Sequence, residues 1–281
     1  MAIRVAVYLV AAYLTVGAFF WFMQGRILFP APTFFEKTTP AISGLPFEDL
    51  QISVNARDHL HAWWIPSAMP SAKVLLVFHG NGYVIEDMAG GRAAGLHEAG
   101  ATLLLVDYRG YGFSSPIAPD ESTVDEDAEA ALNYLRRERN VPVDQVFVLG
   151  RSIGSGPATY LAAKYSGLGG LILESPFTSI DDAARAIWYL RIYPVGLILR
   201  THFANASRIS SVRAPVLIVA GTSDTLTPLW MAERIFALAS EPKQLYLVSH
   251  AGHDDLADVG GDALIEKLRE FISDRLHLLK R

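Results

Sequence analysis

The sequence of 281 residues contains no cysteine. Disulfide bonds, thiolate metal sites and a cysteine nucleophile are therefore excluded. Positive charge is also scarce, because 24 Lys and Arg residues stand against 29 Asp and Glu residues and the net charge is −5. No window holds the basic patch that nucleic-acid binding requires, so we expect no nucleic-acid partner.

Two other binding patterns are missing. The segment DYRGYGFSS (107–115) is rich in glycine, but it lacks the GxGxxG spacing of nucleotide-binding loops, and we interpret it as a packed turn that supports a neighbouring loop. Several histidines show no metal-ligand spacing along the chain, so we predict surface or packing roles for them and no metal site. These histidines are His59, His61, His97, His202 and His277.

Apolar residues are abundant and concentrated at the beginning of the chain. The composition is 51% hydrophobic and 19% charged, which indicates a membrane segment added to a globular domain. Residues 5–23 (VAVYLVAAYLTVGAFFWFM) carry no charge, and as a helix they would cover about 28 Å, close to the thickness of a bilayer core. We predict a single-pass anchor in a lipid bilayer over residues 3–24. A cleaved signal peptide is the alternative.

The residues that flank the predicted anchor fit a membrane interface but do not fix the orientation of the helix. Arg4 and Arg26 lie on its two sides, and the aromatic residues 19–22 stand where an interfacial belt forms. One arginine on each side leaves the orientation in the membrane open.

The rest of the chain divides into a linker and one domain. Residues 25–48 carry several prolines and little periodicity, which is typical of an extended linker. The domain, residues 49–281, opens with two strand-like runs around the turn NARD, which predict a hairpin. Continuous apolar runs then alternate with amphipathic segments, a pattern that predicts a mostly parallel, doubly wound α/β sheet buried on both faces. The apolar runs are residues 73–78, 102–106, 145–149, 170–174, 215–220 and 244–249.

The segments between the predicted strands fit helices. Residues 122–140 start at the capping residue Ser122, with acids in the first turn and arginines in the last. Residues 227–240 and 262–280 follow the same helical period. Residues 175–214 are apolar, aromatic and longer than a simple crossover requires, so we predict a short cap over the mouth of the sheet.

A serine stands between two glycines at the end of one predicted strand, in GRSIG (150–154). Gly-x-Ser-x-Gly at a strand-to-helix junction is the nucleophile elbow, in which the glycines permit a sharp turn that exposes Ser152. The helix that follows would point the main-chain N–H of Ile153 at a developing oxyanion. A tight turn filled by small residues is the alternative for so short a pattern.

A serine hydroxyl needs a base, and this architecture places an acid and then a histidine later in the chain. Asp224 follows the strand 215–220, and His253 follows the strand 244–249. Both loops lie at the carboxyl edge of a parallel sheet, where Ser152 also lies, so we predict that the three side chains act together.

Nearby titratable residues are weaker candidates. Asp254 and Asp255 adjoin His253, and we interpret them as solvated or helix-capping residues. His250 falls at a strand end, where a structural hydrogen bond is expected. His79 begins the loop HGNG and is expected to brace it, while Gly80 lets the backbone approach Ser152 and the main-chain N–H of Asn81 serves as the second oxyanion donor.

Six motifs in this order resemble the α/β-hydrolase superfamily: FHGNG, VDYRGYGFSS, GRSIGSGPA, ESPFTS, APVLIVAGTSD and HAGH. Within it, the chain is similar from about residue 28 onward to the membrane-anchored BEM46/ABHD13-like and ABHD17-like serine hydrolases. The resemblance implies a Ser152–His253–Asp224 triad, an oxyanion hole at Asn81 and Ile153, no cofactor and an N-terminal anchor. The first loop reads HGNGYV, whereas many relatives read HGNAGN.

We therefore predict a serine hydrolase that cleaves a small-molecule carboxylic ester or thioester through an acyl-enzyme. Aromatic residues in the cap, beside a bilayer anchor, favour an acyl-lipid substrate, and core packing under the cap explains them nearly as well. These residues are Trp188, Tyr189, Tyr193 and Phe203. A serine peptidase or amidase of the same fold and a non-catalytic membrane-tethered scaffold are the alternatives.

Overall fold

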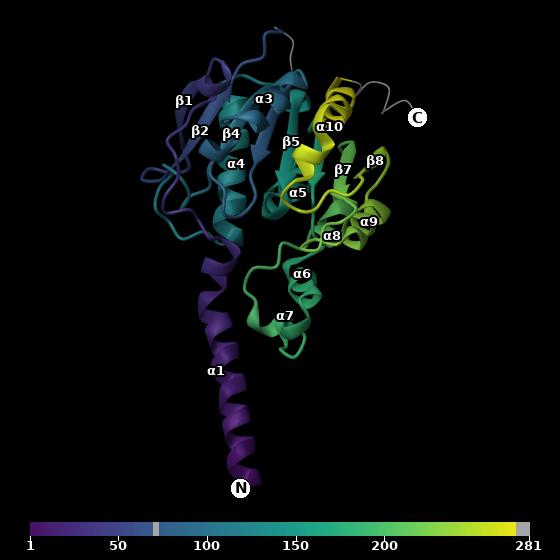
Figure 1. Ribbon diagram of the computed structural model, residues 1–281. Coiled ribbons are helices and arrows are strands. Elements are labelled where there is room, and N and C mark those ends of the chain that lie inside the picture. Colours follow the sequence, from purple (N-terminus) through teal and green to yellow (C-terminus); the bar gives the residue numbers. More distant parts are fainter. Residues whose placement is uncertain (70–72, 274–281) are drawn as a thin grey trace.

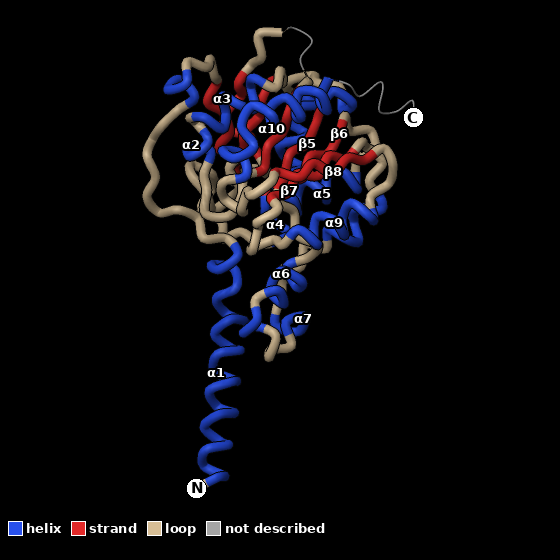
Figure 2. The backbone as a smooth tube through the Cα atoms, turned by 45° about the vertical axis from the view of Figure 1, so that its right-hand side comes forward, coloured by secondary structure: helices blue, strands red, loops and turns tan. Residues whose placement is uncertain are grey.

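The computed structural model describes residues 1–69 and 73–273 (Figures 1 and 2). Its centre is an eight-stranded sheet in the order β1-β2-β4-β3-β5-β6-β7-β8, in which β1–β2 and β2–β4 pair antiparallel and the other neighbours pair parallel. The predicted mostly parallel α/β sheet is confirmed. The strands are β1 (Glu48–Ser53), β2 (His59–Ile65), β3 (Val74–Phe78), β4 (Thr102–Val106), β5 (Val146–Arg151), β6 (Gly170–Glu174), β7 (Val216–Gly221) and β8 (Lys243–Val248).

The central strands are buried along almost their whole length, as continuous apolar runs predict. The last strand differs, because β8 lies at the edge of the sheet and most of its residues are half-buried. Because the central strands are buried on both faces, hydrophobic residues form two clusters, one on each face of the sheet.

Helices cover both faces. The first cluster packs under α4 (Glu121–Arg137), α5 (Ser155–Lys164) and α9 (Leu229–Leu238), and the second under α2 (Ile85–Met88), α3 (Gly91–Glu98) and α10 (Leu256–Ser273). The helix predicted from residue 262 begins earlier, with a non-helical break at Gly261. Its predicted end, residues 274–280, lies outside the described residues.

The predicted cap of α4 is wrong. Asp120, not Ser122, caps the helix, since its carboxylate accepts a hydrogen bond from the Thr123 main-chain N–H at 2.8 Å. The Thr123 hydroxyl in turn accepts from the Asp120 main-chain N–H at 2.8 Å. This reciprocal pair satisfies two terminal donors at once, which Ser122 inside the first turn cannot do.

Helix α1 (Ala2–Leu28) projects from the domain (Figure 1). Among the described residues it is the one helix long and apolar enough to span a membrane, with a mean hydropathy of 2.0. N-terminal signal sequences share these properties, so the anchor over residues 3–24 stays a prediction. The helix continues into the predicted linker, because the first proline of the chain is Pro30.

The region predicted as a cap contains short helical pieces. They are α6 (Ile180–Ala186), the turn Trp188–Leu190, α7 (Val195–Ile198) and α8 (Asn205–Arg208). In both ribbon views α6 and α7 lie beside α1, away from the sheet, and α7 contacts α1 (Figures 1 and 2).

Candidate active site

Ser152 occupies a strained turn between β5 and α5. Its φ of +52° lies in the left-handed region, which a non-glycine residue adopts at an energetic cost and most often at functional sites. A Cβ atom at Gly150 would collide with the Gly154 carbonyl oxygen, and one at Gly154 would collide with the Phe78 carbonyl oxygen. Both glycines are therefore needed for this turn, in which the Ser152 residue is only 8% exposed.

The structure brings Ser152, His253 and Asp224 together. His253 Nε2 lies 2.9 Å from Ser152 Oγ, and His253 Nδ1 lies 2.8 Å from Asp224 Oδ2. Asp224 follows β7 and His253 follows β8, so the parallel strands deliver all three side chains to one edge of the sheet. The arrangement is able to move a proton away from the serine hydroxyl.

Comparisons with known proteins show the family of the chain. Residues 73–193 match the family described as alpha/beta hydrolase fold. The chain is 33% identical to the uncharacterized protein Rv2307c of Mycobacterium tuberculosis over 263 residues, covering 91% of this chain and 89% of that protein. It is 30% identical to human alpha/beta hydrolase domain-containing protein 17B over 213 residues, covering 74% of this chain and 69% of that protein. The chain belongs to the α/β-hydrolase family.

The fold of this hydrolase is also found in solved structures. The esterase Pf2001 of Pyrococcus furiosus superposes with a TM-score of 0.71 over 87% of this chain and 98% of that chain. The two sequences are 18% identical, so the likeness concerns the fold. The predicted resemblance to the superfamily is confirmed, and it identifies the protein as a hydrolase of this fold.

The candidate acid Asp224 is held by a neighbour, Thr227, that the sequence analysis missed. Asp224 Oδ2 accepts a hydrogen bond from the Thr227 hydroxyl at 2.8 Å, and Oδ1 accepts from the main-chain N–H of Leu226 at 2.9 Å and of Thr227 at 2.8 Å. Burial alone raises the pKa of Asp224, but the hydrogen bonds from His253 and Thr227 outweigh burial, and the pKa lies below its ordinary value. Asp224 is therefore a carboxylate at neutral pH. The threonine three residues after the aspartate in SDTLT (223–227) is the sequence feature that could have indicated this contact.

Arg151 holds the loop that carries His253, and the sequence analysis missed it too. Its Nη2 donates to the carbonyl oxygens of His253 at 3.2 Å and Asp254 at 3.3 Å, while the guanidinium lies 5.0 Å from the centre of the Tyr83 ring. The residue before the serine is a variable position of the elbow pattern, so no sequence signal indicated this role.

The weaker candidates lie where the sequence analysis expects them. His250 is exposed in the turn after β8, where its main-chain N–H donates to the Thr222 hydroxyl at 2.8 Å. The side chain of Asp254 is 78% exposed. Asp255 Oδ1 accepts from the Gly252 main-chain N–H at 2.6 Å and so stabilises the turn before α10.

The loop after β3 lies against the serine. A Cβ atom at Gly80 would be 3.6 Å from Ser152 Cβ, so the backbone that leads to Asn81 passes close to the hydroxyl. Ile153 lies directly after Ser152, in the short turn Ser152–Gly154. Oxyanion binding by the main-chain N–H groups of Asn81 and Ile153 stays a prediction.

His79 braces this loop, as predicted. Its Nδ1 lies 2.7 Å from the Gly80 carbonyl oxygen, and its Nε2 lies 3.3 Å from Asp107 Oδ1. The Tyr108 hydroxyl donates to the His79 carbonyl oxygen at 2.9 Å. Residues 107–115 therefore support the first loop, which confirms the interpretation of that glycine-rich segment.

A buried acid–histidine group lies behind the loop. His61, Glu86 and Asp107 offer three possible metal ligands within 4.8 Å of one another, and they come from β2, α2 and the end of β4. Burial, together with the charge of Asp107, raises the pKa of Glu86 to about 7. Contacts within the group account for its arrangement, because His61 Nδ1 lies 3.4 Å from Asp107 Oδ2 and Asp107 Oδ1 accepts from the Ile85 main-chain N–H at 2.9 Å. Sequence spacing gave no sign of it, since its members come from separate segments.

Proposed function

We propose that this hydrolase cleaves carboxylic esters or thioesters of small molecules with Ser152 as the nucleophile, His253 as the base and Asp224 as the orienting carboxylate. The observation that carries the proposal is the continuous hydrogen-bonded chain from Ser152 Oγ to His253 Nε2 at 2.9 Å and from His253 Nδ1 to Asp224 Oδ2 at 2.8 Å. A buried carboxylate fixes the histidine tautomer that can accept the serine proton.

Catalysis would take two acyl-transfer steps. Ser152 Oγ attacks the acyl carbonyl carbon while His253 Nε2 accepts its proton, and the main-chain N–H groups of Asn81 and Ile153 stabilise the oxyanion. His253 then gives this proton to the departing alcohol or thiol, as the bond from the acyl carbon to the leaving oxygen or sulfur breaks. Water attacks the acyl-enzyme in the same way, its proton passes through His253 to Ser152 Oγ, and the free acid is released.

We also propose that α1 anchors the protein in a bilayer. The apolar side chains along this helix are largely exposed, including Tyr8 at 73% and Phe22 at 72%, and a bilayer would cover them. The catalytic domain would then lie next to the membrane surface.

Labelling with a fluorophosphonate probe tests the nucleophile. We expect a covalent adduct on Ser152, located by mass spectrometry, because an activated serine reacts readily with such probes. Ser152→Ala should abolish labelling and lower kcat for p-nitrophenyl butyrate by about 10⁶-fold while thermal unfolding stays unchanged. An unlabelled wild-type protein, or a Ser152→Ala variant that retains activity, would contradict the proposal.

A further inference from the structure

We infer that the cavity between α1 and the cap binds the acyl chain of an ester resident in the bilayer, and that this substrate enters from the adjacent leaflet. Helix α1 is then one wall of the substrate site in addition to being an anchor. The inference rests on the proposed function of Ser152 and extends it by naming the substrate class.

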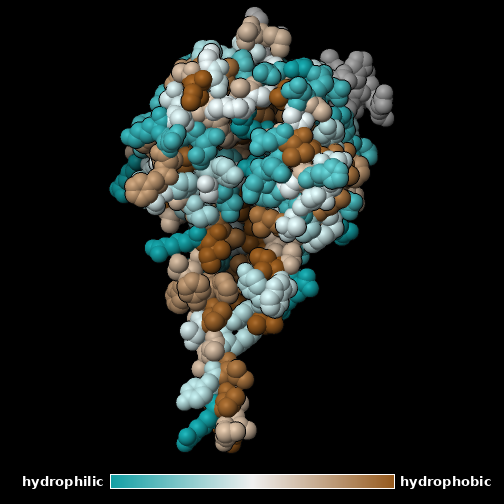
Figure 3. All heavy atoms as spheres, viewed as in Figure 1, coloured by the Kyte–Doolittle hydropathy of each residue, from teal (hydrophilic) through white to brown (hydrophobic). Residues whose placement is uncertain are grey.

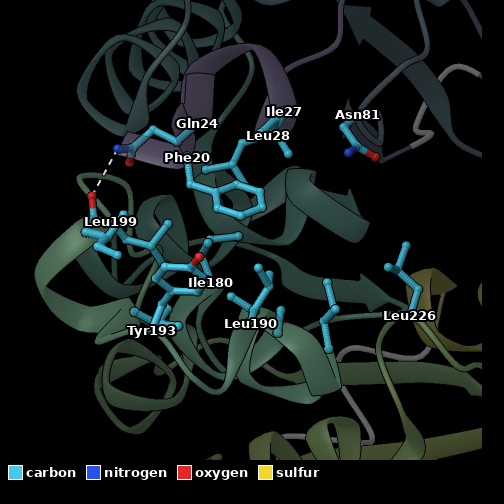
Figure 4. Close-up of a pocket in the computed structure, with 15 residues that line it drawn as sticks. Phe20, Gln24, Ile27, Leu28, Asn81, Ile180, Leu190, Tyr193, Leu199 and Leu226 are labelled. Atoms are coloured by element: carbon cyan, nitrogen blue, oxygen red, sulfur yellow. Dashed lines mark hydrogen bonds between the residues drawn. The ribbon is translucent and has the colours of Figure 1, made fainter. Parts of the chain in front are cut away.

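The cavity has a volume of about 250 Å³ and an almost wholly apolar lining (Figure 4). Helix α1 contributes Phe20 and Leu28, and the cap contributes Ile187, Leu190 and Ile198. A site of this composition offers an acyl chain dispersion contacts and removal from water, with few polar groups to desolvate.

One end of the cavity reaches the catalytic loops. Asn81 and Leu226 line that end, which Figure 4 shows on the side away from Gln24 and Leu199. Asn81 follows Gly80, which lies against Ser152, and the main-chain N–H of Leu226 donates to Asp224. An ester whose carbonyl carbon lies at Ser152 could therefore extend its chain from the catalytic centre toward α1.

Gln24 joins α1 to the cap with its whole amide group. Its Nε2 donates to the Ile198 carbonyl oxygen at 3.0 Å, and its Oε1 accepts from the Arg200 main-chain N–H at 2.7 Å. The residue is 4% exposed, so the cap covers it. A helix that served only as an anchor would gain nothing from a buried glutamine at this position, whereas a wall of a binding site must be fixed to the opposite wall.

A second contact fixes the tip of the cap to α1 at a point nearer the N-terminus of the helix than Gln24. The rings of Tyr13 and Tyr193 stack with centroids 4.6 Å apart, and the Tyr13 hydroxyl donates to the Ile192 carbonyl oxygen at 2.9 Å. Tyr13 and Gln24 are separated by about 16 Å of helix. A bilayer core about 30 Å thick that begins near Gln24 would therefore reach its midplane close to the tip of the cap.

The outer surface of the cap suits that location. The exposed fraction is 77% for Trp188, 66% for Ile192 and 84% for Leu197. Arg185 and Arg191 are exposed on the same surface, and their long side chains would have to extend toward the headgroups. Figure 3 shows hydrophobic residues gathered over α1 and the region beside it. The Arg200 guanidinium lies 4.9 Å from the centre of the Trp21 ring, a pair typical of the membrane interface. The cavity therefore lies between two elements that would both be in lipid.

A matched pair of variants in α6 tests the binding site. Ala184 lines the cavity, whereas Ala186 lies on another side of the cap beside Arg191 and Trp230. The full-length protein is placed in phosphatidylcholine vesicles and assayed with p-nitrophenyl laurate and p-nitrophenyl butyrate. Ala184→Phe should lower the laurate-to-butyrate ratio of kcat/KM by about tenfold, because the new ring fills the space for the distal chain. Ala186→Phe should leave the ratio unchanged, and equal ratios in the two variants would overturn the inference.

The source of the substrate is tested in the same vesicles. Adding phosphatidylcholine at constant total laurate ester dilutes the ester within the bilayer without changing its bulk concentration. The rate should fall with the mole fraction of ester in the bilayer if entry is from the leaflet. A rate that does not depend on the mole fraction would show that the ester enters from water, and it would overturn the inference of entry from the leaflet.

A binding measurement separates this inference from the proposed chemistry. In the Ser152→Ala background, a palmitic acid analogue with a diazirine on its chain should crosslink to residues 180–199, and Ala184→Phe but not Ala186→Phe should lower the yield. If wild-type Ser152 proves inert while this difference appears, the proposed chemistry fails and the acyl-chain site stands. If Ser152 reacts, and Ala184→Phe and Ala186→Phe crosslink equally, the acyl-chain site is wrong while the proposed chemistry stands.

Discussion

The two ends of the proposed active site are built in different ways. At the polar end, Ser152, Asp224 and His253 each follow a strand of one rigid sheet, and two hydrogen bonds of 2.8 and 2.9 Å fix the reacting atoms. At the apolar end, a long helix and short helical turns meet side by side around a cavity. Proton transfer requires atoms placed within fractions of an ångström, whereas a flexible acyl chain requires only shape and apolar surface. In the proposed function, the sheet thus positions the reacting atoms precisely, and the peripheral segments determine the substrate preference.

After Ser152→Ala, the largest effect should again come from the polar end, with Asp224→Asn. The amide keeps the shape of the side chain but cannot act as a carboxylate, so the histidine loses the partner that stabilises its protonated form. We expect kcat for p-nitrophenyl butyrate to fall by about 10⁴-fold, with the same thermal stability to within a few degrees. A loss smaller than about tenfold would mean that the carboxylate does not orient His253 during catalysis.

A smaller effect is expected one contact further out, at Thr227. Thr227→Val removes the hydroxyl that donates to Asp224 at 2.8 Å but keeps the two main-chain donors to its other oxygen. We expect kcat to fall by about tenfold with little change in KM, because the loss concerns the orientation of the acid and not substrate binding.

Two controls accompany Thr227→Val. Thr227→Ser keeps the hydroxyl and should restore the activity, while Thr222→Val alters a hydroxyl in the same loop that serves His250 and should have no effect. An equal loss in Thr227→Ser would point to packing of the methyl group instead of the hydrogen bond.

The smallest effect should come from the apolar end. Phe20 lines the cavity, whereas Phe22, two residues further along the same helix, is 72% exposed. Phe20→Ala should enlarge the cavity and shift preference from laurate toward longer acyl esters by about three- to fivefold in kcat/KM, which corresponds to the burial of about one additional CH₂ group. Phe22→Ala should leave the chain-length profile unchanged. Matching profiles for the two variants would remove α1 from the substrate site and leave it only an anchor.

Much of the polar end could be predicted from the sequence because local patterns encode it. Continuous apolar runs mark buried parallel strands, and a residue that directly follows such a strand must lie at its carboxyl edge, which made Ser152, Asp224 and His253 candidates. The wrong prediction of the α4 cap was a local error as well. Asp120 and Ser122 are both good capping residues two positions apart, and only the geometry of Thr123 decides between them.

The supporting residues and the apolar end could not be predicted in this way. Arg151 contacts the His253 loop across 102 positions, and Gln24 contacts Arg200 across 176 positions. The buried group of His61, Glu86 and Asp107 likewise comes from three separate segments. No periodicity or spacing within one segment records such contacts, because they depend on how complete elements pack against one another.

The amide of Gln24 has a consequence for the biogenesis of the protein. Its carbonyl partner on Ile198 is synthesised 174 residues later, which at ordinary translation rates is a delay of about 9 to 35 s. If α1 lies in a bilayer, as proposed, it could occupy the bilayer during this interval, while the glutamine would need water or headgroups in place of the cap. The final depth and tilt of α1 would then be set late, when the cap packs against it, so that insertion into the membrane and completion of the proposed substrate cavity would be a single assembly event.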